Sequence, residues 1–327
     1  MIKYIGKRLV YITFVFFVVS ILLFTIYKLV PGDPVAMQLD GKAGSLTPAQ
    51  YEQLYNQTKE RLGLNKPIYI QYFVWISNML QGDFGISSTQ RVPVIRLVAS
   101  PMKNTILLNV ASLILVFGIT IPLGIVTAVR KGSKFDTAVQ VATIIGYSMP
   151  SFIIALIAIV ILAVKFPVFP ISGVNSAGLT GSSWILLKDK LYHMMLPLIV
   201  LTVSSLGGIT RYVRAAMIEA LRMDYIRTAR AKGLKEKVVI YSHAFRNALI
   251  PVVTIMTAWF VGIFGGSVVI ESIFLWNGMG KILIDSLLQK DFPVVLAMQM
   301  FYVILTLAGN LLMDLVYGLV DPRVKIG

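Results

Sequence analysis

The segment "YIRTARAKGLKEKVVIYSHAFRNALIP", residues Tyr225–Pro251, separates two long runs that contain no charged residue. It carries one acidic residue and six basic ones: Glu236 against Arg227, Arg230, Lys232, Lys235, Lys237 and Arg246. The wider range Arg211–Arg246 holds nine cations. Each of them costs about 2.5–3.5 kcal/mol at the centre of a bilayer. We therefore expect this segment to lie outside a membrane that the flanking runs cross.

Six runs of 19 to 28 residues lack Asp, Glu, Lys and Arg, in a chain of 327 residues of which 57% are apolar. About 20 residues of helix cross the hydrocarbon layer, and a soluble protein rarely has six such runs. The sequence thus predicts an all-α integral membrane protein with six transmembrane helices. The runs are Leu9–Tyr27, Asn104–Val129, Thr137–Val164, Leu191–Thr210, Asn247–Ile270 and Phe292–Met313.

The basic residues predict the orientation of these helices. Six spans place four short segments on one side of the membrane, and these hold 17 of the 30 cations. They are the N-terminal tail, the turn Arg130–Lys134, the segment Arg211–Arg246 and the C-terminal tail. Short basic loops stay in the cytoplasm, so both termini are expected there. The net charge of +15 is explained by this topology, and no nucleic-acid partner is expected.

The predicted topology divides the chain into four parts. These are the tail and first helix in residues 1–30, an extracellular helical segment in 31–103, five helices in 104–321 with a cytoplasmic loop at 211–247, and a tail at 322–327. The first run could instead be a cleaved signal peptide. However, 19 apolar residues exceed a usual signal core, and no small-residue cleavage site follows it.

The extracellular segment should contain two helices. Thr47 suits an N-cap, with Pro48 at the first helical position, Gln50 three residues after the cap and Gly63 at the C-terminal end. A second helix is expected at about Pro67–Leu80. Its aromatic residues fit either the headgroup level of a membrane or the core of a small subdomain: Tyr69, Tyr72, Phe73 and Trp75.

The basic segment itself predicts a helix, a sharp turn and a second helix. Ile218, Leu221, Tyr225 and Ala229 form a first apolar stripe, and Gly233 ends that helix. The second stripe is Val238, Tyr241, Phe245 and Leu249. Because these apolar stripes lie outside the lipid, they need a protein partner. A short helix presented by two membrane spans can insert into a cleft on a cytosolic protein.

Other residues bear on a transport path or on catalysis. Pro150, which follows Ser148, should kink the third run, at the edge of a path or simply for packing. Gly262 and Gly266 predict a close helix approach. No cysteine occurs, and neither histidine stands in a metalloprotease motif. "GMGK" at Gly278–Lys281 lacks the spacing of a phosphate-binding loop, so no cofactor is expected on this chain.

At this point the sequence resembles the inner-membrane permease subunits of ATP-binding-cassette importers, specifically the B-type subunit of oligopeptide and dipeptide permeases. The likeness runs nearly end to end through "PGDP", "GLNKP", "GDFGIS", "SMPSF", "ARAKG", "HAFRNALIP", "ESIFLWNGMG", "DFP" and "DLVYGLVDPR". Two positions depart from the general EAA-type motif. Arg227 replaces its acidic residue, and Arg246 stands where its first proline is expected.

The resemblance implies a type I importer permease fold in a bacterial inner membrane, with residues 104–321 as its type-1 transmembrane domain. It implies a heterodimer with a second permease, two cytosolic ATPases that bind ATP and magnesium, and an extracytoplasmic peptide-binding protein. A coupling helix would dock on an ATPase through these residues: Arg227, Thr228, Ala229, Arg230, Ala231, Lys232, Gly233 and Leu234. Candidate path residues are Ser148, Pro150, Arg211 and Glu271.

Two alternatives remain open at this stage. Related permeases carry dipeptides, nickel, heme or sugars. An ion-driven secondary transporter usually keeps ionisable residues at the membrane centre, whereas here Glu271 and Asp314 stand only at the ends of the runs.

Overall fold

The computed structural model describes residues 2–30, 32–33, 35–36, 39, 44 and 46–320. Among these residues the fold is helical, and one isolated antiparallel bridge joins Ile86 to Pro93. The flanking prolines of "PGDP" and the tail 322–327 lie outside the described residues. The prediction of an all-α protein is confirmed.

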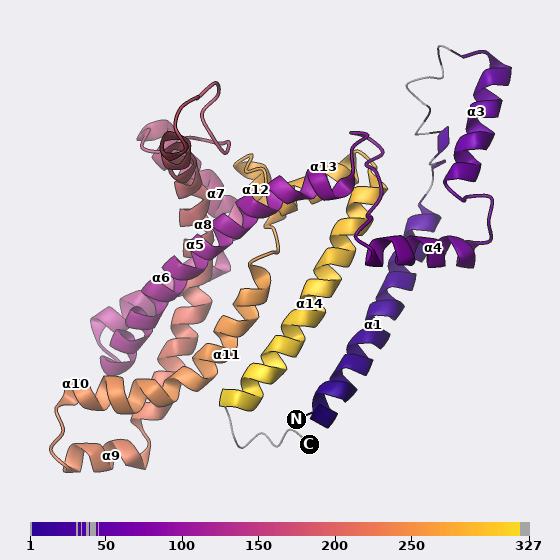
Figure 1. Ribbon diagram of the computed structural model, residues 1–327. Helices are drawn as coiled ribbons and strands as arrows, with labels where there is room; N and C mark the ends of the chain where they lie inside the picture. The colour runs from indigo at the N-terminus through magenta and orange to yellow at the C-terminus, as the bar shows by residue number, and fades with distance from the viewer. Residues whose placement is uncertain are drawn as a thin grey trace. The chain divides into compact units, whose positions relative to one another are not determined.

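The helices follow one another along the chain, as Figure 1 shows. They are α1 (Ile2–Leu29), α3 (Pro48–Arg61), α4 (Ile68–Leu80), α5 (Val94–Val129), α6 (Lys134–Ser148), α7 (Ser151–Ile159), the π-helix η1 (Val160–Lys165), α8 (Ser183–Leu221), α9 (Asp224–Ala231), α10 (Glu236–Val238), the π-helix η2 (Val239–Phe245), α11 (Arg246–Gly262), α12 (Val268–Ile273), α13 (Met279–Leu288) and α14 (Phe292–Val320).

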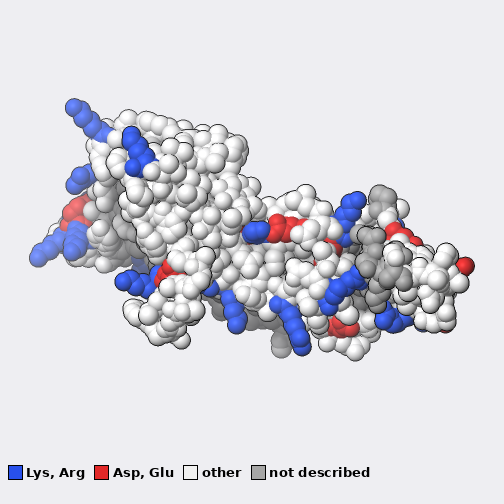
Figure 2. Space-filling view, turned by 90° about the horizontal axis from the view of Figure 1, so that it is seen from above, with Lys and Arg blue, Asp and Glu red and all other residues white. Residues whose placement is uncertain are grey.

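Four helices are long and apolar enough to cross a membrane: α1, α5, α8 and α14. The pair formed by α6 with α7 and η1 makes a fifth candidate, although it is bent by 100°. The fifth uncharged run differs from the expectation, because α11 ends at Gly262 after 17 residues and the chain turns before α12. Figure 2 shows wide areas of surface without Lys, Arg, Asp or Glu, as lipid contact requires.

The bend at Pro150 is larger than an ordinary proline kink. Met149 leaves the helical conformation with ψ 130°, as the residue before a proline tends to do. Pro150 then caps the start of α7. The predicted interruption is therefore confirmed, and it breaks the helix in two.

Residues 1–100 and 282–307 form one compact unit. Within it Thr47 makes the expected capping box with Gln50, and Gly63 follows the end of α3 with φ 65°. The aromatic residues of α4 divide between the two predicted roles. Tyr72 and Trp75 pack on Phe24 of α1, while the exposed Tyr69 and Phe73 suit the headgroup level.

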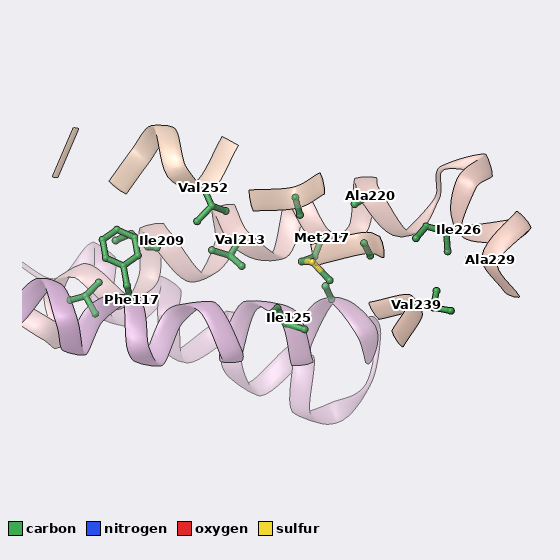
Figure 3. Packing of buried hydrophobic residues seen from close by; sticks show 14 residues of the cluster. Phe117, Ile125, Ile209, Val213, Met217, Ala220, Ile226, Ala229, Val239 and Val252 are labelled. Carbon is green, nitrogen blue, oxygen red and sulfur yellow. The ribbon is translucent and has the colours of Figure 1, made fainter. Parts of the chain in front are cut away.

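Residues 101–281 and 308–327 form the second unit. Its largest apolar cluster joins α5, α8, α9, η2 and α11, and Figure 3 shows these side chains meeting between the helices. The cluster contains Val116, Phe117, Ile125, Ala128, Ile209, Val213, Met217, Ala220, Ile226, Ala229, Val239, Ala244, Ala248 and Val252.

Glycines set the closest approaches in this unit, and of the predicted pair Gly266 makes one whereas Gly262 does not. Gly262 is the last residue of α11, and Gly266 lies beyond it, so the two do not share a helix face. A Cβ on Gly266 would lie 2.0 Å from the backbone nitrogen of Gly280. A Cβ on Gly207 of α8 would lie 2.3 Å from the carbonyl oxygen of Thr143 in α6.

Candidate functional site

The basic segment forms a helical hairpin whose turn is made by Gly233. Helix α9 ends at Ala231, and Gly233 takes the left-handed conformation with φ 75°. Its N–H donates to the Arg230 carbonyl at 2.9 Å, and the Leu234 N–H donates to the Ala229 carbonyl at 3.4 Å. These two bonds define a Schellman motif, which glycine favours because it lacks a Cβ. The expected helix end at Gly233 is confirmed.

The first apolar stripe is confirmed at three of its four positions, since Ala229 lies in the apolar cluster and Ile218 and Leu221 pack against it, but Tyr225 does not. A single helix was expected through Ile218 and Tyr225, but α8 ends at Leu221 and α9 begins at Asp224. This break shifts the helical phase, so Ile226 is buried with Ala229, whereas Tyr225 is 39% exposed. The residue that anchors α9 is therefore Ile226.

The second stripe is confirmed only in part, at Phe245, which packs against the same cluster. Val238 and Tyr241 are exposed, and the buried residues are Val239, Ala244 and Ala248. The cause is the π-helix η2, which adds a residue to each turn and so shifts the face that meets the core. Small alanines occupy the buried face, and they gave little apolar signal.

The exposed side of the hairpin combines apolar and basic residues. We call its exposed basic and large apolar residues the coupling surface, after the predicted role of this segment: Arg222, Met223, Tyr225, Arg227, Arg230, Lys232, Leu234, Lys235, Lys237, Val238 and Tyr241. Arg230 spans the turn and donates to both oxygens of Glu236, at 3.2 and 2.6 Å. The hydrogen bonds from Arg230 hold the pKa of Glu236 below its ordinary value, so this contact persists at neutral pH.

The hairpin is mechanically continuous with the membrane helices. Ile226 is fully buried and Ala229 nearly so, both in the cluster that contains Met217 of α8 and Ile125 of α5 (Figure 3). Close-packed interiors transmit displacement because they compress little. A force on α9 would therefore reach α5, α8 and α11 through this shared core.

The eight predicted coupling residues lie together at the end of α9 and in the turn. Ala229 is buried, and the other seven are exposed: Arg227, Thr228, Arg230, Ala231, Lys232, Gly233 and Leu234. In Figure 1, α9 stands at the end of α8 opposite to the loop between η1 and α8.

A pocket of about 450 Å³ lies between α5, α8 and α11. Its described lining includes the polar residues Asn109, Ser112 and Ser205, beside Trp259 and Leu201. The Asn109 amide donates to the carbonyls of Ile263 at 2.9 Å and of Gly265 at 2.8 Å. It thereby satisfies backbone acceptors that the end of α11 leaves free. The pocket is an apolar cavity with a few fixed polar groups.

The four predicted path residues are not gathered at this pocket. Ser148 and Pro150 are exposed at the break between α6 and α7, Arg211 is exposed on α8, and Glu271 is 1% exposed. None of them is among the described lining residues of that pocket.

Glu271 instead fixes the segment "ESIFLWNGMG" to the start of the second run. Its carboxylate accepts from the Thr105 hydroxyl at 2.8 Å and from the Lys281 N–H at 3.0 Å. The same Thr105 oxygen accepts from the Met279 N–H. A Cβ on Gly278 would lie 2.5 Å from both Thr105 and Glu271. The buried carboxylate is thus fully engaged.

Replacing Glu271 by Gln should destabilise the protein. An amide group offers one acceptor oxygen where the carboxylate offers two, so a buried donor loses its partner at a cost of about 1–3 kcal/mol. We expect a lower thermal midpoint for the purified protein in detergent. Glu219→Gln, an exposed site on α8, is the matched control. An unchanged midpoint with impaired transport would instead place Glu271 in the substrate path.

Sequence reasoning missed an ion pair that joins α6 to α8. Arg214 donates to both oxygens of Asp136, at 2.8 and 2.7 Å, and Asp136 also accepts from the Gly132 N–H. The sequence signal was available: Asp136 follows Ser133, the N-cap of α6, and is an acid directly after the basic turn Arg130–Lys134. Asn109 could likewise have been noticed as an amide within an uncharged run.

Neither histidine belongs to a metal site among the described residues, where no group of three or more His, Asp or Glu could hold an ion. The His193 ring is buried and contacts the Asp189 carbonyl at 2.9 Å. His243 lies in η2.

Comparison with known proteins agrees with this architecture. Residues 120–326 match the family model for the binding-protein-dependent transport system inner membrane component, and residues 1–123 match the N-terminal model of such membrane components. The chain is 42% identical to the oligopeptide transport system permease protein AppB of Bacillus subtilis, over 94% of each chain. It is 38% identical to the dipeptide transport system permease protein DppB of Escherichia coli, over 99% of each chain.

Another relative is the di/tripeptide transport system permease protein DppB of Pseudomonas aeruginosa, at 36% identity over 99% of each chain. The matched models together extend from residue 1 to residue 326, and the resemblance seen in the motifs is confirmed. The chain belongs to the family of inner-membrane components of binding-protein-dependent transport systems, and it is a multi-pass transport subunit.

Proposed function

We propose that this chain is the B-type permease of an ATP-driven importer that carries peptides, most simply oligopeptides, into a bacterial cytoplasm. The observation that supports this most directly is the full-length similarity to permeases named for oligopeptide, dipeptide and di/tripeptide transport. Dipeptides are the second candidate substrate, because two of these relatives are named for dipeptide and di/tripeptide transport. The chain itself would bind no nucleotide, and its partners would hold ATP and magnesium.

The proposed topology has six spans with both termini in the cytoplasm. The sixth span is α11, continued by the residues up to α12, in addition to the five candidates found by length and composition. Residues 31–103 would form the extracellular segment, and residues 104–321 the type-1 transmembrane domain. This orientation places the basic hairpin 211–247 in the cytoplasm, as its charge requires.

Two cytosolic ATPases, a second permease and an extracytoplasmic binding protein are the proposed partners. The coupling surface suits an ATPase cleft because exposed apolar side chains stand among cations that can steer docking. Tyr225, Leu234 and Tyr241 are 39–49% exposed. The core beneath Ile226 would carry ATPase closure into α5 and α8.

The substrate path is proposed to pass the pocket at Asn109, Ser112 and Ser205. These groups can hydrogen-bond peptide backbones without selecting side chains, while Trp259 supplies apolar contact. Ser148 and Pro150, at the break between α6 and α7, and Arg211 of α8 remain predicted path residues. Glu271 would act indirectly, because it holds the segment "ESIFLWNGMG" against α5 through Thr105.

Reconstitution with the partner permease, both ATPases and the binding protein tests the proposal. Labelled oligopeptide uptake into proteoliposomes should require ATP on the cytoplasmic side and should persist without a proton or sodium gradient. A catalytically inactive ATPase is the control. Uptake that follows an ion gradient without ATP would contradict the proposal, and competition by dipeptides, nickel, heme or sugars would identify another substrate.

A further inference from the structure

A second pocket, of about 390 Å³, lies where α1 ends, beside α3 and α4. Its described lining includes the charged residues Lys28, Asp33 and Lys59, together with Tyr55 and Gln71. It belongs entirely to the unit formed by residues 1–100 and 282–307. The pocket is therefore separate from the coupling surface and from the pocket at Asn109.

Lys28 is held inside this pocket. It lies in the last turn of α1, a helix long and apolar enough to span a membrane, so its ammonium group stands near the edge of the hydrocarbon layer. A lysine that only snorkels would extend into water. Lys28 is instead half-buried and donates to Gln71 Oε1 at 2.5 Å. The ammonium also lies over the rings of Phe24 and Tyr27. Since an ammonium has three N–H donors, one hydrogen bond to Gln71 does not exhaust it.

Asp33 supplies the opposite charge. Its carboxylate accepts from the Tyr55 hydroxyl at 2.7 Å and from the Val35 N–H at 2.8 Å. Burial alone would raise the pKa of Asp33, but these hydrogen bonds and the charge of Lys59 together lower it. Asp33 is therefore ionised at neutral pH. The pocket offers two cationic groups and one carboxylate among its described lining residues.

We propose that this pocket binds the headgroup of phosphatidylethanolamine, with its phosphate at Lys28 and Lys59 and its ammonium at Asp33. The charges of the pocket and of this zwitterionic headgroup are complementary. Ile68 lines the pocket. The same helices, α1 and α4, carry exposed apolar side chains that could receive acyl chains: Ile26, Leu29, Ile68, Tyr69 and Phe73. Lys28 lies on α1 and its partner Gln71 lies on α4, while Tyr55, which binds Asp33, lies on α3. A bound headgroup would therefore join these three helices.

Native mass spectrometry of the full transporter in detergent, with added lipids, tests this site. Wild-type protein should retain phosphatidylethanolamine better than phosphatidylcholine of the same acyl chains, because the choline group has no N–H to donate to Asp33. Lys28→Gln and Lys59→Gln should each weaken retention about tenfold, as the loss of a charge-assisted contact predicts. Asp33→Asn should remove the preference for ethanolamine over choline.

Lys188→Gln, at an exposed position on α8, is the control and should retain lipid like the wild type. Lys59→Gln leaves the bond between Lys28 and Gln71 in place, so it reports on the pocket even if Lys28→Gln prevents folding. Equal retention of both lipids, or retention unaffected by Lys59→Gln and Asp33→Asn, would overturn the proposal. Displacement of the lipid by millimolar inorganic phosphate would show a free-anion site instead.

Discussion

Gly233→Val should abolish peptide uptake and transport-stimulated ATP hydrolysis while the protein still inserts into the membrane. The reason is conformational, because Gly233 has φ 75° and a Cβ there would meet no atom within 4 Å. A left-handed conformation costs an ordinary residue about 1–2 kcal/mol, and a β-branched residue is a genuine outlier there. The valine variant would thus relax the turn and displace the coupling surface, which the ATPases are proposed to hold.

The open space around Gly233 provides a sharp control. Asparagine tolerates the left-handed conformation, so Gly233→Asn should keep most of the uptake and hydrolysis. Gly63 ends α3 with the same Schellman pattern and φ 65°, and Gly63→Val should strain that turn without uncoupling hydrolysis. Uptake and stimulated hydrolysis measured together in proteoliposomes distinguish these cases. Coupling that survives Gly233→Val would remove the turn from the mechanism.

Local signals in the sequence predicted much of this fold. The capping residues of α3, the glycines that end α3 and α9, and the break at Pro150 each act within a few residues of chain, so their effect can be derived without tertiary structure. Five of the six uncharged runs coincide with candidate spans. For the fifth run, hydropathy could not show that the helix ends at Gly262.

What the sequence left open depends on tertiary contacts. The anchor of α9 is Ile226, because α8 stops at Leu221, and the π-helix η2 places alanines on the buried face. Neither event has a strong local signal, since propensities differ by only tenths of a kcal/mol between most residues. Glu271 was predicted as a path residue, whereas its contact with Thr105 joins residues far apart in sequence.

Arg211 and Arg214 stand three residues apart on α8. Replacing Arg214 by glutamine should lower stability, whereas replacing Arg211 should not. The Asp136 side chain is 4% exposed and that of Arg214 is 21% exposed. Breaking a buried pair costs about 3–5 kcal/mol, and the partial exposure of Arg214 favours the lower end of that range. Arg214→Gln should therefore lower the thermal midpoint of the purified protein markedly, because α6 loses this ion pair with α8 and Asp136 is left buried without its cation.

Arg211 is exposed, so Arg211→Gln should leave the free energy of unfolding within about 0.5 kcal/mol of the wild type. Thermal midpoints and peptide uptake measured on both variants then separate structure from transport. If Arg211 lines the path as predicted, its variant loses uptake at unchanged stability, and Arg211→Lys restores part of it through the charge. A normal uptake rate for Arg211→Gln would exclude this path role, and equal stability losses in the two variants would contradict the assignment of the ion pair to Arg214.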